Sequence, residues 1–249
     1  MTAELAAEIV VIALCLAAGG VLKGATGAGA PVLAVPALAA FFDVRFAVVV
    51  MLLPNLLTNI WQVWRYRPHL PERGLMIPLV AGGVIGIVLG TWALKHLPGD
   101  ALSLVVAFAV LAYVALRLLR PHWRLPMDRG RVLALPAGLA AGVLQGSAGL
   151  SAPVSITFLN ALRLGRERFI AGISTLFVTF TAVQIVAVRL SGLLELNDLI
   201  YGVLALGAVS ASMPAGAALA RRVSPEALDR VILGLLCLIA AKLFFDALV

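Results

Sequence analysis

Apolar residues occur along this chain in long runs, and short polar or proline-containing stretches separate most of them. Within a run the apolar side chains cover every side of a helical projection, which is typical of helices embedded in lipid. An open sheet is excluded there, because lipid offers no partners for unpaired backbone groups. We therefore predict an all-α, polytopic membrane protein with helical segments at 5–22, 24–42, 46–64, 75–94, 101–119, 132–148, 150–162, 169–190, 198–219 and 228–248.

The composition supports a membrane protein. Of the 249 residues, 62% are hydrophobic and 12% are charged, whereas soluble domains have about 25% charged residues. A transmembrane helix needs about 20 apolar residues, so we expect eight or more full crossings among the segments. Glu4 and Glu8 argue against a cleaved signal peptide, because such a peptide begins with a basic region.

The basic residues are unevenly divided between alternate loops. The positive-inside rule places the arginine-rich loops in the cytoplasm and therefore both termini outside. This rule also accounts for the net charge of +7, so the lipid bilayer is the expected partner and nucleic acid is not. Self-association into a homo-oligomer is compatible with the sequence. The arginine-rich set comprises Arg65, Arg67, Arg73, Arg117, Arg120, Arg124, Arg129, Arg131, Arg163, Arg166, Arg168, Arg221, Arg222 and Arg230, and the other set comprises Arg45, Lys95 and Arg189.

The chain contains an internal repeat with an offset of 122 positions. This offset aligns residues 24–32 with residues 146–154 and also pairs Gln62 with Gln184. We therefore predict one integrated membrane domain made of a first repeat at 1–120, a cytoplasmic linker at 121–131 and a second repeat at 132–249. The two halves begin on opposite sides of the membrane, so the repeat is inverted. Inverted repeats are typical of secondary transporters, whose sites lie near the midplane at broken helices.

Each repeat carries a glycine-rich motif that is expected to break a helix. Pro31 and Pro153 suit the first turn of the helix that follows each break. Segment 150–162 is too short to cross the membrane comfortably. Residues 5–42 and 132–162 therefore form either full crossings or hairpins that turn inside the membrane.

A helix break inside the membrane exposes backbone N–H groups at the positive end of a helix dipole. A bound anion satisfies such groups, so two breaks that meet from opposite faces would hold one anion at the midplane. Close helix packing is the alternative explanation of the glycines, and it is the expected role of Gly82, Gly86 and Gly90. The substrate-binding candidates are Lys23, Gly24, Thr26, Gly27, Gly29, Pro31, Asn59, Gln62, Gln145, Gly146, Ser147, Gly149, Ser151, Pro153 and Gln184.

Lys23 and its repeat partner Gln145 directly precede the two motifs. An ammonium group in the bilayer is costly and indicates a functional role, although a lysine at a helix end also extends its ammonium to the interface. Asn59 and Gln62 share one face of a helix with Asn55, and Gln184 shares a similar face with Ser174 and Thr181. These polar residues either line the site or join helices by hydrogen bonds.

Several classes of chemistry are not expected. The carboxylates and the three histidines fall near segment ends or in loops, so a buried proton relay of the usual kind is not visible. No GK[ST] follows the glycines, which excludes a P-loop. The chain has no Ser–His–Asp set and no zinc-ligand spacing, so we expect no enzyme activity, no metal and no cofactor.

Two segments resemble the sulfite exporter TauE/SafE family, also called the sulfonate permease family. They are residues 23–36 (KGATGAGAPVLAVP) and 145–153 (QGSAGLSAP), each followed by an apolar helix, and the PEAL pattern at 225–228 also fits. The resemblance implies transport of sulfur-containing oxyanions such as sulfite, sulfoacetate or aryl sulfonates across the bacterial inner membrane.

The main hypothesis is therefore a secondary transporter for small sulfur-containing anions that works by alternating access. Two other functions stay open from the sequence: a passive anion channel that uses the same motifs as a filter, and a membrane scaffold subunit that transports nothing.

Overall fold

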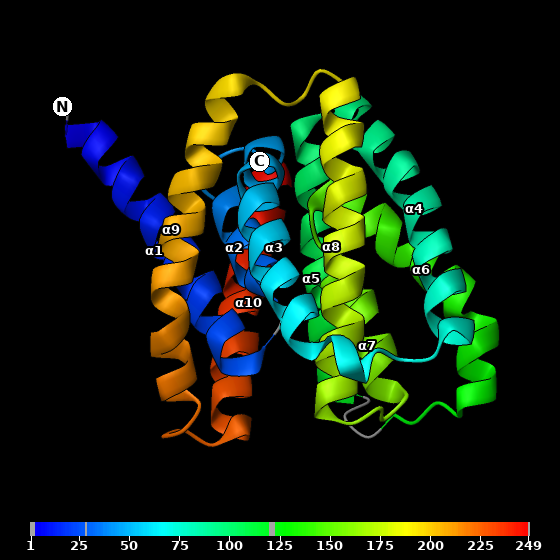
Figure 1. The fold of residues 1–249 in the computed structure, drawn as a ribbon. Helices are drawn as coiled ribbons and strands as arrows, with labels where there is room; N and C mark the ends of the chain where they lie inside the picture. The colour runs from blue at the N-terminus through cyan, green and yellow to red at the C-terminus, as the bar shows by residue number, and fades with distance from the viewer. Residues whose placement is uncertain (1–2, 28, 120–122, 249) are drawn as a thin grey trace.

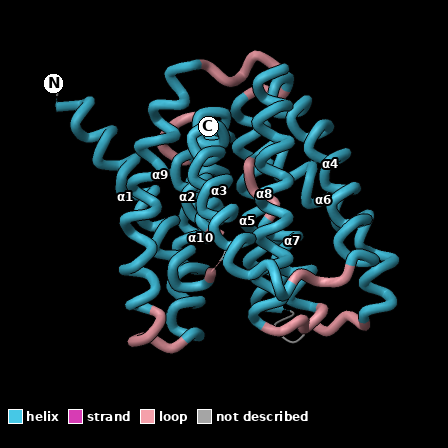
Figure 2. Tube along the Cα trace, in the orientation of Figure 1, coloured by secondary structure: helices cyan, strands magenta, loops and turns pink. Residues whose placement is uncertain are grey.

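The computed structural model describes residues 3–27, 29–119 and 123–248. These residues form α-helices, a short 3-10 helix (Arg67–His69) and connecting loops, and no strand (Figures 1 and 2). The all-α prediction is therefore confirmed. The described helices of the first half are α1 (Ala3–Thr26), α2 (Ala30–Ala39), α3 (Val44–Tyr66), α4 (Arg73–His96) and α5 (Gly99–Leu119). Those of the second half are α6 (Met127–Ala148), α7 (Ala152–Ala161), α8 (Arg166–Leu190), α9 (Leu196–Leu219) and α10 (Pro225–Leu248).

Seven of the described helices are long and apolar enough to cross a membrane, namely α1, α3, α4, α5, α8, α9 and α10. The predicted count of eight full crossings is therefore not confirmed. The helix α6 is 22 residues long, but its charged first turn and its glycine, glutamine and serine residues lower its hydropathy. The helices α2 and α7 have 10 residues each, which is about 15 Å of helix and too short for a crossing.

The helix bounds follow the offset found in the sequence. The bounds of α2 and α7 differ by 122 residues, as do the last residues of α1 and α6. One predicted boundary was wrong, and one helix begins inside the predicted linker. Residues 24–26 continue α1 rather than beginning the next helix, and the predicted linker at 121–131 overlaps α6 from residue 127 onward. Residues 121 and 122 of that linker lie outside the described part of the chain.

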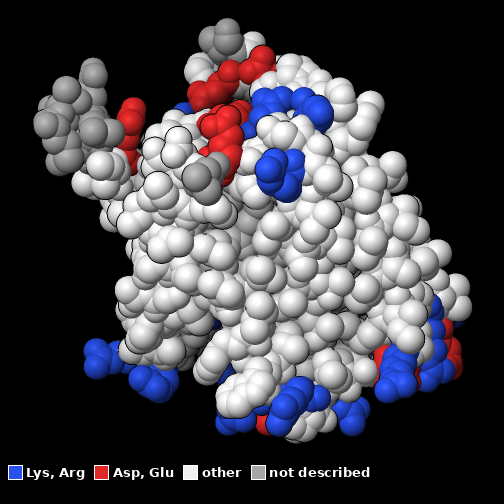
Figure 3. Space-filling model, turned by 45° about the horizontal axis from the view of Figure 1, so that its top comes forward, with Lys and Arg blue, Asp and Glu red and all other residues white. Residues whose placement is uncertain are grey.

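The loops divide between two ends of the molecule. The connections α2–α3, α4–α5 and α8–α9 lie at the end that holds the start of α1 and the end of α10, whereas α3–α4, α7–α8 and α9–α10 connect at the opposite end (Figure 2). We call the latter the Arg-rich end, because its loops and flanking turns carry Arg65, Arg67, Arg163, Arg166, Arg221 and Arg222. On the face seen in Figure 3, a broad belt without charged side chains separates the two ends.

One ion pair fixes the start of α6 at the Arg-rich end. The Arg131 guanidinium donates to both carboxylate oxygens of Glu72, the residue before α4. The paired guanidinium lowers the pKa of Glu72 below its ordinary value, because it stabilises the charged carboxylate.

Two helix crossings bring backbone against backbone. Where α4 crosses α6, a Cβ atom at Gly86 would overlap the carbonyl oxygen of Leu139, and one at Gly142 would overlap that of Gly83. Where α1 crosses α9, Gly24 meets the carbonyl oxygen of Met213 in the same way. Small residues permit such close approach between helices in lipid, so the packing interpretation holds for these glycines.

This packing yields a stability prediction. We expect Gly142→Ala to lower the free energy of unfolding by about 1–3 kcal/mol, because the new methyl group must push the α4 backbone away. Gly207→Ala is the matched control, since nothing lies within 4 Å of a Cβ there, and its effect should stay within about 1 kcal/mol. Unfolding of the purified protein in detergent measures both, and equal effects would contradict the described crossing.

Candidate functional site

The first helix break follows from glycine and proline in the sequence. The helix α1 ends at Thr26, and Gly27 and Gly29 have φ angles of 80° and 90°. This left-handed region favours glycine, because a Cβ atom causes steric strain there. The N–H of Gly27 closes the last turn of α1 on the Lys23 carbonyl at 2.8 Å. Pro31 then lies in the first turn of α2, as predicted.

The second break has the same construction. The helix α6 ends at Ala148, and Gly149 has a φ angle of 65°. The N–H groups of Gly149 and Leu150 donate to the carbonyls of Gln145 and Leu144, at 2.8 and 3.3 Å. This is the pairing of a glycine-terminated helix end. Pro153 lies in the first turn of α7, so both breaks occur where the repeat predicts them.

The two aligned glutamines hold the ends of the broken helices. The Gln62 amide of α3 donates to the Gly27 carbonyl at 2.6 Å, and the Gln184 amide of α8 donates to the Gln145 carbonyl at 2.7 Å. A helix end leaves its last carbonyls without partners in the helix. Gln62 bonds such a carbonyl and also accepts from Ser174 at 3.2 Å. Gln184 adds a second donor to the Gln145 carbonyl, which also accepts from the Gly149 N–H.

Gln145 closes the second break from inside. Its Oε1 accepts from the Ser151 hydroxyl at 2.7 Å and from the Ser151 backbone N–H at 3.2 Å, while its Nε2 donates to Gln184 at 2.8 Å. The side-chain oxygen of Gln145 thus occupies donors at the start of α7. Of the neighbouring candidates, Ser147 donates to the Val143 carbonyl within its own helix, and Gly146 packs against the α4 backbone.

Lys23 differs from its repeat partner Gln145 in where its side chain lies. It is 0% exposed, so its ammonium does not extend to the interface. The ammonium donates to Asn59 Oδ1 at 2.9 Å, and Asn59 donates to Asn55 Oδ1 at 2.8 Å. Asn55 donates in turn to Thr181 of α8 at 2.8 Å. Lys23 therefore begins a buried polar chain that links α1, α3 and α8.

A cavity adjoins the first break. It has a volume of about 280 Å³, and both Thr26 and Gly29 line it. We call it the inner cavity. Its other walls come from α5, α7, α8 and α10, so both halves of the chain contribute to it. The lining residues are Leu22, Thr26, Gly29, Val32, Tyr113, Arg117, Ile156, Asn160, Phe169, Asp229 and Ile232.

A second cavity, the outer cavity, adjoins the inner one and reaches residues of the Arg-rich end. It has a volume of about 520 Å³ and shares Arg117, Ile156, Asn160 and Phe169 with the inner cavity. Its remaining walls include Arg163 of the α7–α8 loop and Arg166 at the start of α8, and both residues are exposed. The two cavities therefore adjoin at these shared residues, and arginines of the Arg-rich end line the outer one.

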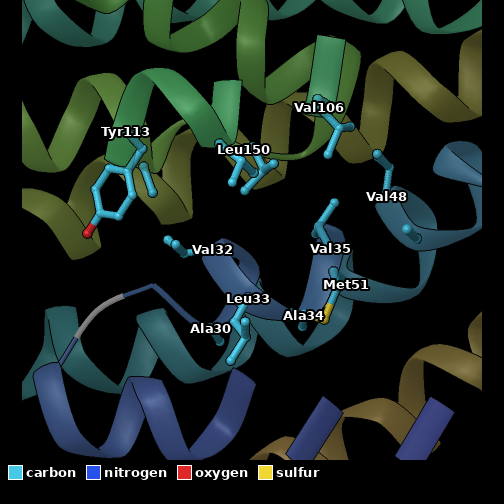
Figure 4. Close-up of a cluster of buried hydrophobic side chains, with 14 of the residues drawn as sticks. Ala30, Val32, Leu33, Ala34, Val35, Val48, Met51, Val106, Tyr113 and Leu150 are labelled. Carbon is cyan, nitrogen blue, oxygen red and sulfur yellow. The ribbon is translucent and has the colours of Figure 1, made fainter. Parts of the chain in front are cut away.

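The second break is sealed by apolar side chains. Leu150 is 1% exposed, and Figure 4 shows it close to Val106 and to Val35 of α2. A Cβ atom at Gly149 would lie 3.3 Å from Val48 and 3.6 Å from Val35. The two breaks therefore have the same construction but different surroundings. The first lies beside a cavity, and the second is covered by packed apolar side chains.

The predicted site residues thus fall into separate groups. Thr26 and Gly29 line the inner cavity, whereas Lys23 and Asn59 pair with each other next to the first break. The sequence analysis did not single out four polar residues of this cavity. The sequence pattern places Arg117 with the arginine-rich loops and Asp229 with the carboxylates near segment ends, although both residues lie inside helices. A charged residue inside an apolar helical segment is the sequence signal that identifies both of them. The four are Tyr113, Arg117, Asn160 and Asp229.

These features define a class of protein: a multi-pass helical membrane protein with two broken helices and, on the face shown in Figure 3, an uncharged belt. The family model described as sulfite exporter TauE/SafE matches residues 11–243, which is nearly the whole chain, and the chain therefore belongs to this family. No curated protein and no solved structure matches it. Membership indicates a membrane transport protein for sulfite or related sulfur anions.

The difference between the breaks predicts thiol accessibility. In a variant whose Cys15 and Cys237 are replaced by alanine, we expect Asn160→Cys to react readily with a charged methanethiosulfonate reagent, because Asn160 lines both cavities. Ser151→Cys is nearly isosteric with the native residue and should not react, because Ser151 is 1% exposed. Mass spectrometry of the labelled protein in detergent measures both, and equal labelling would contradict the sealed second break.

Proposed function

We propose that this protein is a secondary transporter that moves small sulfur-containing anions, such as sulfite, sulfoacetate or a sulfonate, across the bacterial inner membrane by alternating access. The observation that carries the proposal is the unequal exposure of two equivalent helix breaks. One break adjoins a cavity that is followed by a second cavity at the Arg-rich end, while the other break is covered by apolar side chains. A carrier in one of its two access states has this asymmetry.

Helix directions and pairings support an inverted repeat of residues 1–120 and 132–249. By the colour order in Figure 1, α3 runs toward the Arg-rich end and its counterpart α8 runs away from it, and α4 and α9 also run in opposite directions. The packed pairs exchange as well, since α1 packs on α9 and α6 packs on α4. In the opposite access state each half would adopt the conformation that the other half has here. The inner cavity would then close, and the second break would open toward the end opposite the Arg-rich end.

The charge distribution supports an orientation. The arginine-rich loops fit the cytoplasmic side by the positive-inside rule, and both termini then lie outside. In this orientation the inner and outer cavities connect to the cytoplasm. The described conformation is then the inward-facing state, ready to bind an anion from the cytoplasm.

An anion at the first break would meet favourable electrostatics. The start of α2 presents the positive end of a helix dipole. Lys23, whose buried ammonium donates to Asn59, lies one helical turn before the break. Gln62 and Gln184 hold the broken ends in place through backbone carbonyls. At the second break Gln145 occupies the Ser151 donors, and in the opposite state we expect it to release them to the anion.

Transport itself is tested in liposomes. We expect the reconstituted protein to take up labelled sulfite, and uptake to accelerate when unlabelled sulfite or a small sulfonate is preloaded inside. Trans-acceleration distinguishes a carrier from a passive channel, which shows uptake without it. Absence of uptake for sulfite and for a panel of sulfonates, with the protein folded and inserted, would contradict the proposal and favour a scaffold.

The role of Lys23 is tested in the same assay. We expect Lys23→Gln to reduce initial uptake about tenfold or more, since a charge-assisted interaction is worth about 1.5–3 kcal/mol. Lys95→Gln is the matched control, because Lys95 is exposed at the end of α4. Thermal unfolding of both variants checks the fold, and normal uptake by a folded Lys23→Gln variant would remove Lys23 from the site.

A further inference from the structure

Two oppositely charged side chains meet in the inner cavity. Arg117 in the last turn of α5 donates from Nη2 to Oδ1 of Asp229 in the first turns of α10, at 2.9 Å. Their side chains are 40% and 35% exposed, so the contents of the cavity reach the pair. The two residues belong to different halves of the chain. An anion that binds here would therefore act on a contact between the halves.

Arg117 has donors to offer beyond this pair. A guanidinium group carries several N–H donors in a planar fork, and Asp229 accepts from one nitrogen of Arg117 in the described part of the chain. The fork matches the oxygens of an oxyanion and binds two of them at once. The Asn160 carboxamide and the Tyr113 hydroxyl belong to residues of the same cavity. Both supply neutral hydrogen-bonding groups of the kind that fix the orientation of a small ligand.

The route to this pair is positively charged. Arg163 and Arg166 line the outer cavity together with Arg117, and no carboxylate is among its described lining residues. A cavity with walls of one charge sign concentrates ions of the opposite sign. Small anions are therefore the ligands that this route favours. Arg163, which lines the route, also has a φ angle of 52°, a left-handed conformation that is uncommon for a residue other than glycine.

We propose that the inner cavity is an oxyanion site in which Arg117 binds the sulfite or sulfonate group, and that Asp229 occupies Arg117 while the site is empty. The entering anion takes the place of the Asp229 carboxylate on the guanidinium. Asp229 thus competes with the substrate, and substrate binding loosens the contact between α5 and α10. This inference rests on the proposed transport function. It adds that Arg117 binds the substrate anion and that the Asp229 carboxylate competes with that anion for Arg117.

Direct binding separates this role from a purely structural ion pair. The full-length protein in detergent is titrated with sulfite and with methanesulfonate in a calorimeter. We expect Arg117→Gln to raise the Kd about 10–100-fold. Arg117→Lys should give an intermediate Kd, because lysine keeps the charge without the planar fork. Asp229→Asn should lower the Kd about 2–5-fold, because an exposed ion pair is a weak competitor.

Arg131→Gln is the matched control, because it breaks an ion pair with Glu72 outside both cavities. We expect it to leave the Kd unchanged. The double variant Arg117→Gln/Asp229→Asn removes both charges of the inner pair. It should unfold near the wild-type temperature and still bind the anion poorly, which shows that weak binding does not come from an unpaired charge.

The outcomes for this site and for transport are distinguishable. Wild-type Kd values in a folded Arg117→Gln variant, or a higher Kd in Asp229→Asn, would overturn the oxyanion site even if the wild-type protein transports sulfite normally. Anion binding that depends on Arg117 and tightens in Asp229→Asn would support the site. That result would hold even if the reconstituted protein transported none of the tested anions, in which case only the proposed function fails.

Discussion

The need to satisfy backbone groups inside lipid governs this structure. A helix that ends within the apolar belt leaves carbonyl and N–H groups without partners, and lipid supplies none. The chain has two such helix ends, and polar side chains form hydrogen bonds with their backbone groups. Gln62 and Gln184 take carbonyls at the ends of α1 and α6, and Gln145 takes the donors of Ser151. Gln62, Gln145 and Gln184 therefore serve the helix breaks, whereas Lys23, Asn59, Asn55 and Thr181 form a separate buried polar chain.

The two breaks share their construction but not their surroundings. Glycine and proline place them at equivalent positions of the repeat, yet Lys23 reaches away to Asn59 while Gln145 folds back onto Ser151. The first break thereby stays available to the inner cavity, and the second is filled from within. In the proposed transport cycle the two breaks exchange these conditions. Glycines at the crossings of α1 with α9 and of α4 with α6 let each helix pair pack closely, and in the proposed cycle each pair moves as one unit.

Much of this arrangement was predictable from local sequence rules. Long apolar runs predicted the helices, and Gly27, Gly149, Pro31 and Pro153 predicted where helices break. The repeat also pointed to Gln62 and Gln184, although their contacts with carbonyls are set by packing that no local rule provides. The cavity was not predictable, because its walls come from both halves. Arg117 and Asp229 are far apart in the sequence, and only the packing of α5 on α10 brings their charges together.

Hydrogen exchange of the two breaks, with and without sulfite, tests the central claim most directly. The protein in lipid nanodiscs would be followed by mass spectrometry over peptides that cover residues 22–36 and 144–158. Reciprocal access predicts that saturating sulfite protects the first break and increases exchange at the second, as the population moves toward the opposite state. Protection of both breaks together, or no change at either one while sulfite binds, would contradict alternating access at these two sites.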